Sequence, residues 1–117
     1  MSETRNITTP IIKALEQMGW LVFRMNSGKL RVRGGYVHMA KKGTADILCF
    51  GDDGIAVWIE TKDPAGATAK EQRDAQSEFK GEVMALGHKY ICATCLDDVL
   101  AFLSQQQRYL GEMKEQP

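Results

Sequence analysis

GTADILCF (residues 43–50), GDDG (51–54) and IAVWIETK (55–62) make up the stretch that decides the fold. Two apolar segments flank a tight turn, which is typical of an antiparallel hairpin with buried strands. Asp46 lies near the start of the first segment, and Glu60 lies near the end of the second. Because these two ends meet in a hairpin, the sequence predicts that the two carboxyl groups lie side by side.

Charged groups at the end of a buried strand must be paired, bind a metal or change their protonation. Lys62 is two residues beyond Glu60 and points to the same face of the strand. Two carboxylates suit Mg²⁺ or Mn²⁺, with the backbone carbonyl of Thr61 as a further oxygen ligand. The set predicts metal-assisted phosphodiester hydrolysis, in which Lys62 is either a base or a stabiliser of negative charge. The alternative is a turn-capping Asp46 beside an edge-strand ion pair.

The rest of the chain alternates helical and extended patterns. Thr9 and Pro10 suit the start of a first helix that Gly19 ends, although Ile7 extends its apolar stripe backwards. Thr68 and Glu71 form a capping box for a long helix to residue 86. We expect a last helix from residue 97 or 98, a frayed tail over residues 110–117, and strands over residues 20–25, 45–50, 55–61 and 89–94. This order predicts an α/β fold, a three-layer α/β/α domain around a central mixed sheet.

Composition is ordinary for one soluble domain: 117 residues, 44% hydrophobic and 26% charged. A polar N-terminus without a signal-peptide core favours a cytoplasmic protein. Cys92 and Cys95 form a CxxC without a recognisable second pair of zinc ligands. We interpret the three cysteines as structural.

Net charge is zero, but the segment from Arg24 to Lys42 carries basic residues and no acidic one. Such a segment suits a phosphate backbone, and the alternative is a solvated hairpin that carries lysines and has no further function. For its conformation, the alternation of basic and apolar residues over 29–39 suggests either a hairpin or a mobile loop. The predicted DNA contacts, which include two polar residues of the adjoining turn, are Arg24, Asn26, Ser27, Lys29, Arg31, Arg33, Lys41 and Lys42.

Four stretches resemble the VRR-NUC domain of the PD-(D/E)XK nuclease superfamily: GWLVFRMNSG (19–28), GTADIL (43–48), WIETK (58–62) and the helix EQRDAQSEF leading to ALGHKY. The resemblance covers nearly the whole chain, from Ile7 to about Leu103, and implies a single nuclease domain over residues 1–117 with a restriction-endonuclease-like core. It implies that Asp46, Glu60 and Lys62 are catalytic, together with a glutamine of the following helix. Gln72 and Gln76 both fit that place.

The family pattern also has a glutamate on the first helix, where this sequence has Thr4 in register and Glu3 one residue away. Glu3 is retained as a metal-ligand candidate. Ala45 replaces the proline of the superfamily name, a position that binds no metal.

The resemblance implies a Mg²⁺- or Mn²⁺-dependent DNA endonuclease that is selective for DNA structure. Small stand-alone members look like phage or bacterial proteins, often homodimers, related to Holliday-junction resolvases and branched-DNA nucleases. Two alternatives remain open, namely a DNA-binding module that does not cleave and an RNA-processing nuclease.

Overall fold

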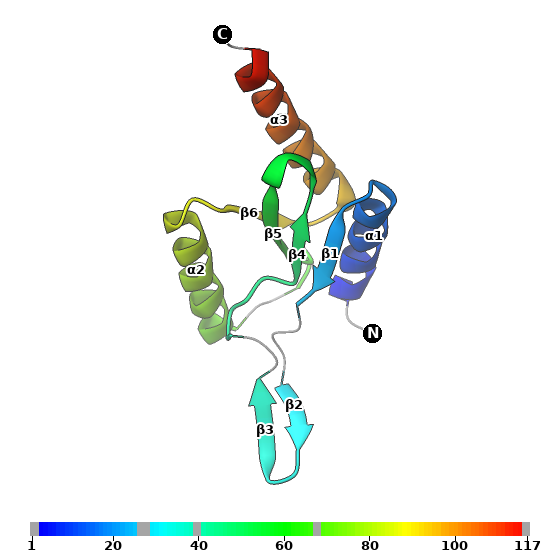
Figure 1. The fold of residues 1–117 in the computed structure, drawn as a ribbon. Helices are drawn as coiled ribbons and strands as arrows, with labels where there is room; N and C mark the ends of the chain where they lie inside the picture. Colours follow the sequence, from blue (N-terminus) through cyan, green and yellow to red (C-terminus); the bar gives the residue numbers. More distant parts are fainter. Residues whose placement is uncertain (1–2, 26–28, 39–40, 67–68, 116–117) are drawn as a thin grey trace.

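The computed structural model describes residues 3–25, 29–38, 41–66 and 69–115 (Figure 1). Its helices are α1 (Glu3–Gln17), α2 (Lys70–Ala85) and α3 (Leu96–Glu115). Its strands are β1 (Leu21–Arg24), β2 (Lys29–Val32), β3 (Gly35–His38), β4 (Ile47–Phe50), β5 (Ala56–Thr61) and β6 (Lys89–Ala93). A short 3₁₀ turn (Asp52–Gly54) joins β4 to β5.

Four strands form a mixed sheet in the order β1-β4-β5-β6. β4 pairs antiparallel with both β1 and β5, whereas β6 runs parallel to β5. The β4–β5 register pairs Ile47 with Ile59 and Phe50 with Ala56, as expected for a hairpin closed by a short turn. The predicted mixed sheet and its central hairpin are confirmed.

Alternate residues of β5 contact different layers of the molecule. Val57 and Ile59 are fully buried in a core shared with α1 and α3. α1 contributes Ile11 and Leu15 to this core, and α3 contributes Val99 and Leu103. Trp58 faces the other side, where its ring packs edge-on against Phe79 of α2 with ring centroids 5.0 Å apart. Because both faces of the sheet are covered by helices, the predicted three-layer α/β/α fold is confirmed.

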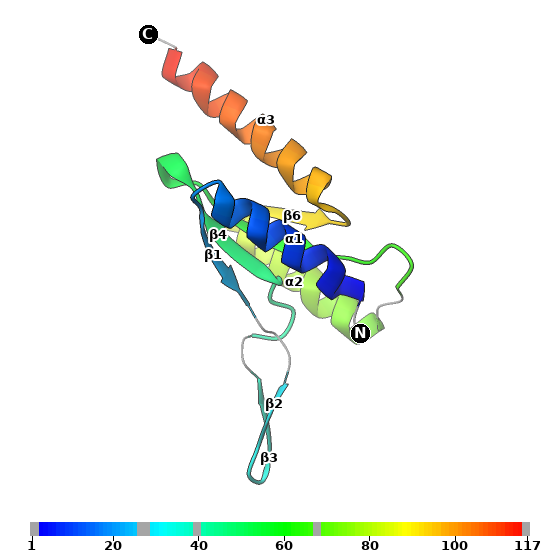
Figure 2. The ribbon, with the colours of Figure 1, turned by 90° about the vertical axis from the view of Figure 1, so that its right-hand side faces the viewer.

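β2 and β3 form a separate two-stranded ribbon that projects away from the main sheet (Figures 1 and 2). Its register pairs Lys29 with His38 and Arg31 with Tyr36, and its tip lies at Arg33 and Gly34. Of the two conformations that the sequence left open for this segment, the structure has the hairpin.

The starts of α1 and α2 differ from the expected caps. α1 begins at Glu3, which agrees with the earlier start that Ile7 indicated, and Pro10 lies inside the helix. Proline removes one backbone hydrogen bond there, but the helix gains the burial of its apolar stripe against the sheet, which extends back to Ile7. The N-cap of α2 is Ala69, which makes no side-chain capping bond, and the predicted cap Thr68 lies outside the described residues.

The C-terminal helix also differs from the expectation. α3 begins at Leu96, and its backbone remains helical to Glu115 where fraying from residue 110 was expected. Asp98 accepts hydrogen bonds from the backbone N–H and the hydroxyl of Thr94, both at 2.9 Å, which fixes the entry into the helix. None of the helices in the described part of the chain has the length and apolar character that a membrane crossing requires.

Candidate metal and nucleic-acid site

Asp46 is held at the start of β4 by the end of β5. Its Oδ2 accepts a hydrogen bond from the backbone N–H of Thr61 at 2.9 Å and another from the Thr61 hydroxyl at 2.7 Å. Both bonds follow from the β4–β5 register, which brings the residue before Ile47 opposite the residues after Ile59. The predicted meeting of the two strand ends is therefore present, and the half-buried Asp46 carboxyl has a fixed orientation.

The Thr61 hydroxyl continues this network into α1. It lies 2.8 Å from the hydroxyl of Thr8, and both residues are buried. Since the single proton of the Thr61 hydroxyl is donated to Asp46, the Thr8 hydroxyl is the donor to Thr61. A relay from Thr8 through Thr61 to Asp46 thus connects the first helix to the carboxylate.

Glu60 lies next to Asp46 and is only 3% exposed. Burial raises the pKa of Glu60 to about 9, with smaller contributions from a hydrogen bond to Asp46 and from the charge of that carboxylate. The charge of Lys62 acts in the opposite direction and lowers this pKa. Two carboxyl groups this close do not both ionise easily without a cation. Glu60 Oε2 is buried, and no hydrogen bond from the described residues reaches it.

Lys62 follows β5 and faces α2. Its Nζ donates a hydrogen bond to Oε1 of Gln76, and both side chains are half-buried. Gln72, one helical turn earlier, is exposed. Of the two glutamines that the sequence left open, Gln76 is the one that contacts the Asp46–Glu60–Lys62 cluster.

The cluster fits a hard divalent cation. The orphaned Glu60 oxygen and the neighbouring Asp46 carboxylate offer hard oxygen donors, and the pKa of Glu60 is raised by its burial and by repulsion between the two acids. Within the described residues, no three His, Cys, Asp or Glu side chains gather at one point. Two carboxylates are enough for Mg²⁺, which keeps several of its waters. The side chain of Glu3 lies outside the described residues, and a ligand role for the Thr61 carbonyl stays a prediction.

β6 forms the other wall of the cluster, because its register pairs Trp58 with Tyr90 and Glu60 with Cys92. Burial, followed by the charges of Glu60, Cys92 and Asp46, raises the pKa of Tyr90. Burial also raises the pKa of Cys92, although its side chain is counted as exposed. Cys49 is buried as expected, whereas Cys92 and Cys95 are exposed free thiols, so the structural interpretation holds for Cys49 alone.

Seven of the eight predicted DNA contacts fall into three groups. Arg33 at the ribbon tip and Lys42 are exposed. Arg24 is exposed and donates a hydrogen bond to the Thr9 hydroxyl at 3.3 Å. The backbones of Lys29 and Arg31 form β2, but their side chains lie outside the described residues, as do Asn26 and Ser27.

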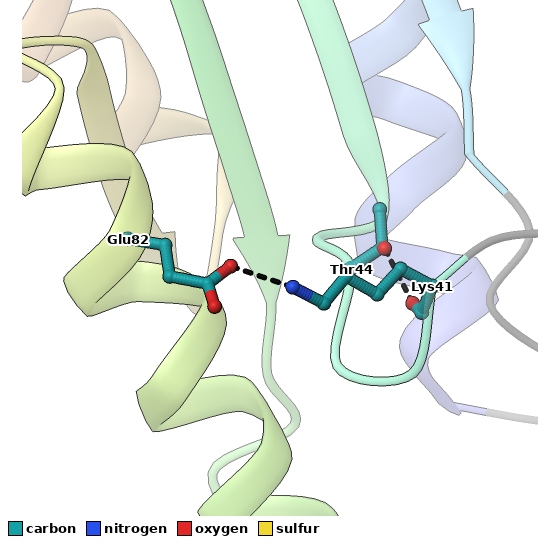
Figure 3. Close-up of polar contacts among 3 residues, drawn as sticks. All are labelled: Lys41, Thr44 and Glu82. Atoms are coloured by element: carbon teal, nitrogen blue, oxygen red, sulfur yellow. Dashed lines mark hydrogen bonds and ion pairs between the residues drawn. The ribbon is translucent and has the colours of Figure 1, made fainter.

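Lys41, the remaining predicted contact, forms an ion pair with α2. Its Nζ lies 2.7 Å from Oε2 of Glu82 on α2, and the Thr44 hydroxyl donates to its backbone carbonyl (Figure 3). Hydrogen bonding to Glu82 and its charge raise the pKa of Lys41. This ammonium group is engaged within the protein, which the sequence did not indicate.

Comparison with known proteins bears on the fold. No family model matches the sequence, and no curated protein matches it. A solved structure described as a VRR_NUC domain superposes with a TM-score of 0.56, over 89% of this chain and 97% of that chain, at 16% sequence identity. The chain has the fold of a VRR_NUC domain. At this identity the likeness carries the architecture, so the chemistry of this VRR_NUC fold has to be argued from its own residues.

Two residues of the network were missed by sequence reasoning. Thr8 was not singled out, because Thr9 was considered as the cap of the first helix, and Thr61 was considered for its carbonyl rather than its hydroxyl. Thr61 ends a strand whose preceding residues are apolar, and a hydroxyl that is buried there needs hydrogen-bond partners. Thr8 carried a comparable signal, because it lies beside Ile7 on the buried stripe of the helix.

Proposed function

We propose that this chain is a divalent-metal-dependent endodeoxyribonuclease that hydrolyses phosphodiester bonds. The observation that carries the proposal is the buried Glu60 carboxyl, which lies beside Asp46 and has one oxygen without a hydrogen-bond donor. A purely structural carboxyl at 3% exposure would be expected to have both oxygens satisfied. The VRR_NUC fold supports the same reading, since the sequence resemblance attaches nuclease chemistry to these residues.

Asp46 and Glu60 would hold the ion, which we propose is Mg²⁺ or Mn²⁺. When bound, such an ion supplies charge neutralisation at the scissile phosphate. The protein contributes the orientation of its ligands: Thr61 fixes one oxygen of Asp46, and the β5–β6 pairing fixes Glu60 opposite Cys92. Ligands held in this way need little rearrangement on binding.

Lys62 is proposed to act on the attacked phosphate or on the attacking water. Its hydrogen bond to Gln76 keeps Nζ on the same face of β5 as Glu60. From there it is suited to stabilise negative charge or to accept a proton, and the first role needs only the geometry described above. Gln76 is a positioning residue for this amine.

The partner is proposed to be DNA, preferentially branched. The exposed cations Arg33 and Lys42 stand before Asp46 in the chain, and the projecting ribbon extends the basic segment away from the cluster (Figure 1). A contact surface of this kind recognises backbone and shape rather than sequence. Two copies of the chain acting together would suit a branched substrate, and we include a homodimer in the proposal.

Cleavage assays test the proposal. The wild type and Asp46→Asn are incubated with branched DNA, linear duplex and RNA of matched length, with Mg²⁺, with Mn²⁺ or with EDTA. We expect cleavage of branched DNA by the wild type with either metal, and none by Asp46→Asn or in EDTA. Salt-sensitive binding without cleavage would support a non-cleaving DNA-binding module instead, and preferential cleavage of RNA would support an RNA-processing enzyme.

A further inference from the structure

Gly43 lies directly on the backbone of α2. It is buried and has φ of +87°, a conformation that L side chains rarely adopt. A Cβ atom built on Gly43 would overlap the carbonyl of Ala75 and would lie 2.9 Å from the backbone nitrogen of Gln76. The chain therefore crosses α2 at the peptide bond that joins Ala75 to Gln76, with no room for a side chain.

This crossing closes a ring of contacts around the candidate site. Gly43 is three residues before Asp46, and the intervening Ala45 is fully buried against Phe79 and Val83 of α2. Asp46 is bonded to Thr61, and the adjacent Lys62 is bonded to Gln76. From Gln76 the ring returns to Gly43 through the Ala75–Gln76 peptide.

A second tether holds the same segment to α2. Lys41 pairs with Glu82, whose Oε2 is 2.7 Å away, and Thr44 bonds back to the Lys41 carbonyl through both its backbone N–H and its hydroxyl (Figure 3). The side chains of Lys41 and Glu82 are 64% and 48% exposed, so this ion pair is the weaker of the two tethers.

We propose that Gly43 is a positioning residue of the candidate site, which sets the separation between Asp46 and the Lys62–Gln76 pair by direct contact with the α2 backbone. The Lys41–Glu82 pair acts in the same direction. The role of these residues in catalysis rests on the proposed function. Their role in metal binding does not need catalysis, so it is measured separately.

The experiment compares Gly43→Ala with Gly87→Ala. Gly87 has nearly the same backbone conformation, with φ of +84°, but a Cβ there meets nothing within 4 Å. Both substitutions introduce the same backbone strain, and only Gly43→Ala adds the collision with α2. Mn²⁺ affinity of the DNA-free protein is measured by electron paramagnetic resonance, together with the unfolding midpoint, and then kcat and KM for branched DNA.

We expect Gly43→Ala to bind Mn²⁺ about 10- to 100-fold more weakly than Gly87→Ala, which is the range for losing support around metal ligands. The value of kcat should fall while KM for DNA stays the same, because the DNA-contacting cations are untouched. Equal Mn²⁺ affinity in the two variants, with wild-type binding intact, overturns the inference and leaves the proposed function standing. A wild type that neither binds Mn²⁺ nor cleaves overturns both.

If Gly43→Ala does not fold, the positioning of this segment against α2 is tested at the second tether by exchanging the charges of the Lys41–Glu82 pair. Lys41→Glu and Glu82→Lys are made singly and together, and the same quantities are measured. We expect each single variant to lose about 2- to 5-fold in Mn²⁺ affinity, as for an exposed ion pair, and the double variant to recover it. If Lys41 instead contacts phosphate, Lys41→Glu raises KM and the second change does not restore it, which overturns the positioning role.

Discussion

Asp46 Oδ2 accepts two hydrogen bonds from one residue, the backbone N–H and the hydroxyl of Thr61. Thr61 is 2% exposed and also receives a hydrogen bond from Thr8, so the carboxylate is oriented from inside the core. Glu60 and Lys62 then lie on the side of the cluster that faces α2. The relationship makes Thr61 the residue through which packing sets the geometry of the acidic pair.

Thr61→Val should therefore weaken both the fold and the site. The loss of the hydroxyl leaves the Asp46 bond unmade in a buried setting, and we expect about 1–3 kcal/mol less free energy of unfolding. Mn²⁺ affinity should fall about 10-fold because the carboxylate loses one of its two fixed donors. Urea unfolding and Mn²⁺ titration measure the two effects. Thr9→Val is the control, since that half-buried hydroxyl bonds the exposed Arg24, and equal effects in the two variants would contradict the assignment.

Glu60→Gln should change how stability depends on pH in the metal-free protein. The pKa of Glu60 is raised from 4.5 to about 9 in the folded chain. Between these values the folded protein keeps a proton that the unfolded chain has released, so the free energy of unfolding falls as the pH rises through this window. The contribution is fully present below pH 4.5, and the loss is complete above pH 9.

The measurement is urea unfolding of both proteins in EDTA at pH 5 and pH 8.5. We expect the wild type to lose stability relative to Glu60→Gln between the two values, since other carboxyl groups contribute equally to both proteins. Mg²⁺ at pH 8.5 should stabilise the wild type more than the variant. Parallel pH dependence in the two proteins would show that Glu60 has the pKa of an ordinary solvated carboxyl group, which contradicts the prediction.

Substitution of Gln76 should lower kcat much more than substitution of Gln72. Gln76→Met keeps the length of the side chain and removes the acceptor for Lys62, so kcat should fall about 100-fold, the lower end of the range for a positioned acid–base group. Gln72→Met, one turn away and exposed, is the control and should change kcat less than twofold. If Gln72→Met is the damaging variant, the wrong turn of the helix has been assigned to the site.

Exposed cations of the segment that precedes Asp46 should determine the salt dependence of DNA binding. Replacing Arg33 and Lys42 by serine removes two phosphate contacts, so the slope of log affinity against log salt should become about 1.8 units less steep. Lys13 and Lys89 are exposed elsewhere, and the corresponding double serine variant is the control. Fluorescence anisotropy measured at salt concentrations between about 50 and 200 mM gives the two slopes. Equal slopes in the two variants would remove this segment from the DNA interface.

Local patterns predicted the central part of the molecule. The apolar–turn–apolar order of residues 43–62 contains the whole β4–β5 hairpin, and a hairpin register is fixed by its turn. The meeting of Asp46 with Glu60 and the choice of two glutamines followed from the same stretch and from helical spacing. These features depend on contacts close in sequence, which single-sequence patterns encode well.

Features that depend on contacts between distant segments could not be predicted from local sequence patterns. Lys41 looked like one more cation of a basic segment, and its partner Glu82 is 41 residues away. Pro10 looked like a helix start because proline favours that position. The turn before it is stabilised by burial against the sheet, which the local sequence does not show. The crossing of Gly43 over Ala75 is a property of two backbones in contact, for which neither residue type is diagnostic.

The Thr8–Thr61 hydrogen bond joins residues 53 apart, whereas Asp46 and Thr61 are 15 apart. Closing the shorter loop costs less chain entropy, so the hairpin is able to form before the first helix docks. In such an early hairpin Glu60 is hydrated and ionised at neutral pH. Enclosure of Glu60 comes with docking of the surrounding helices, so at neutral pH without metal the final stage of folding takes up a proton from solution.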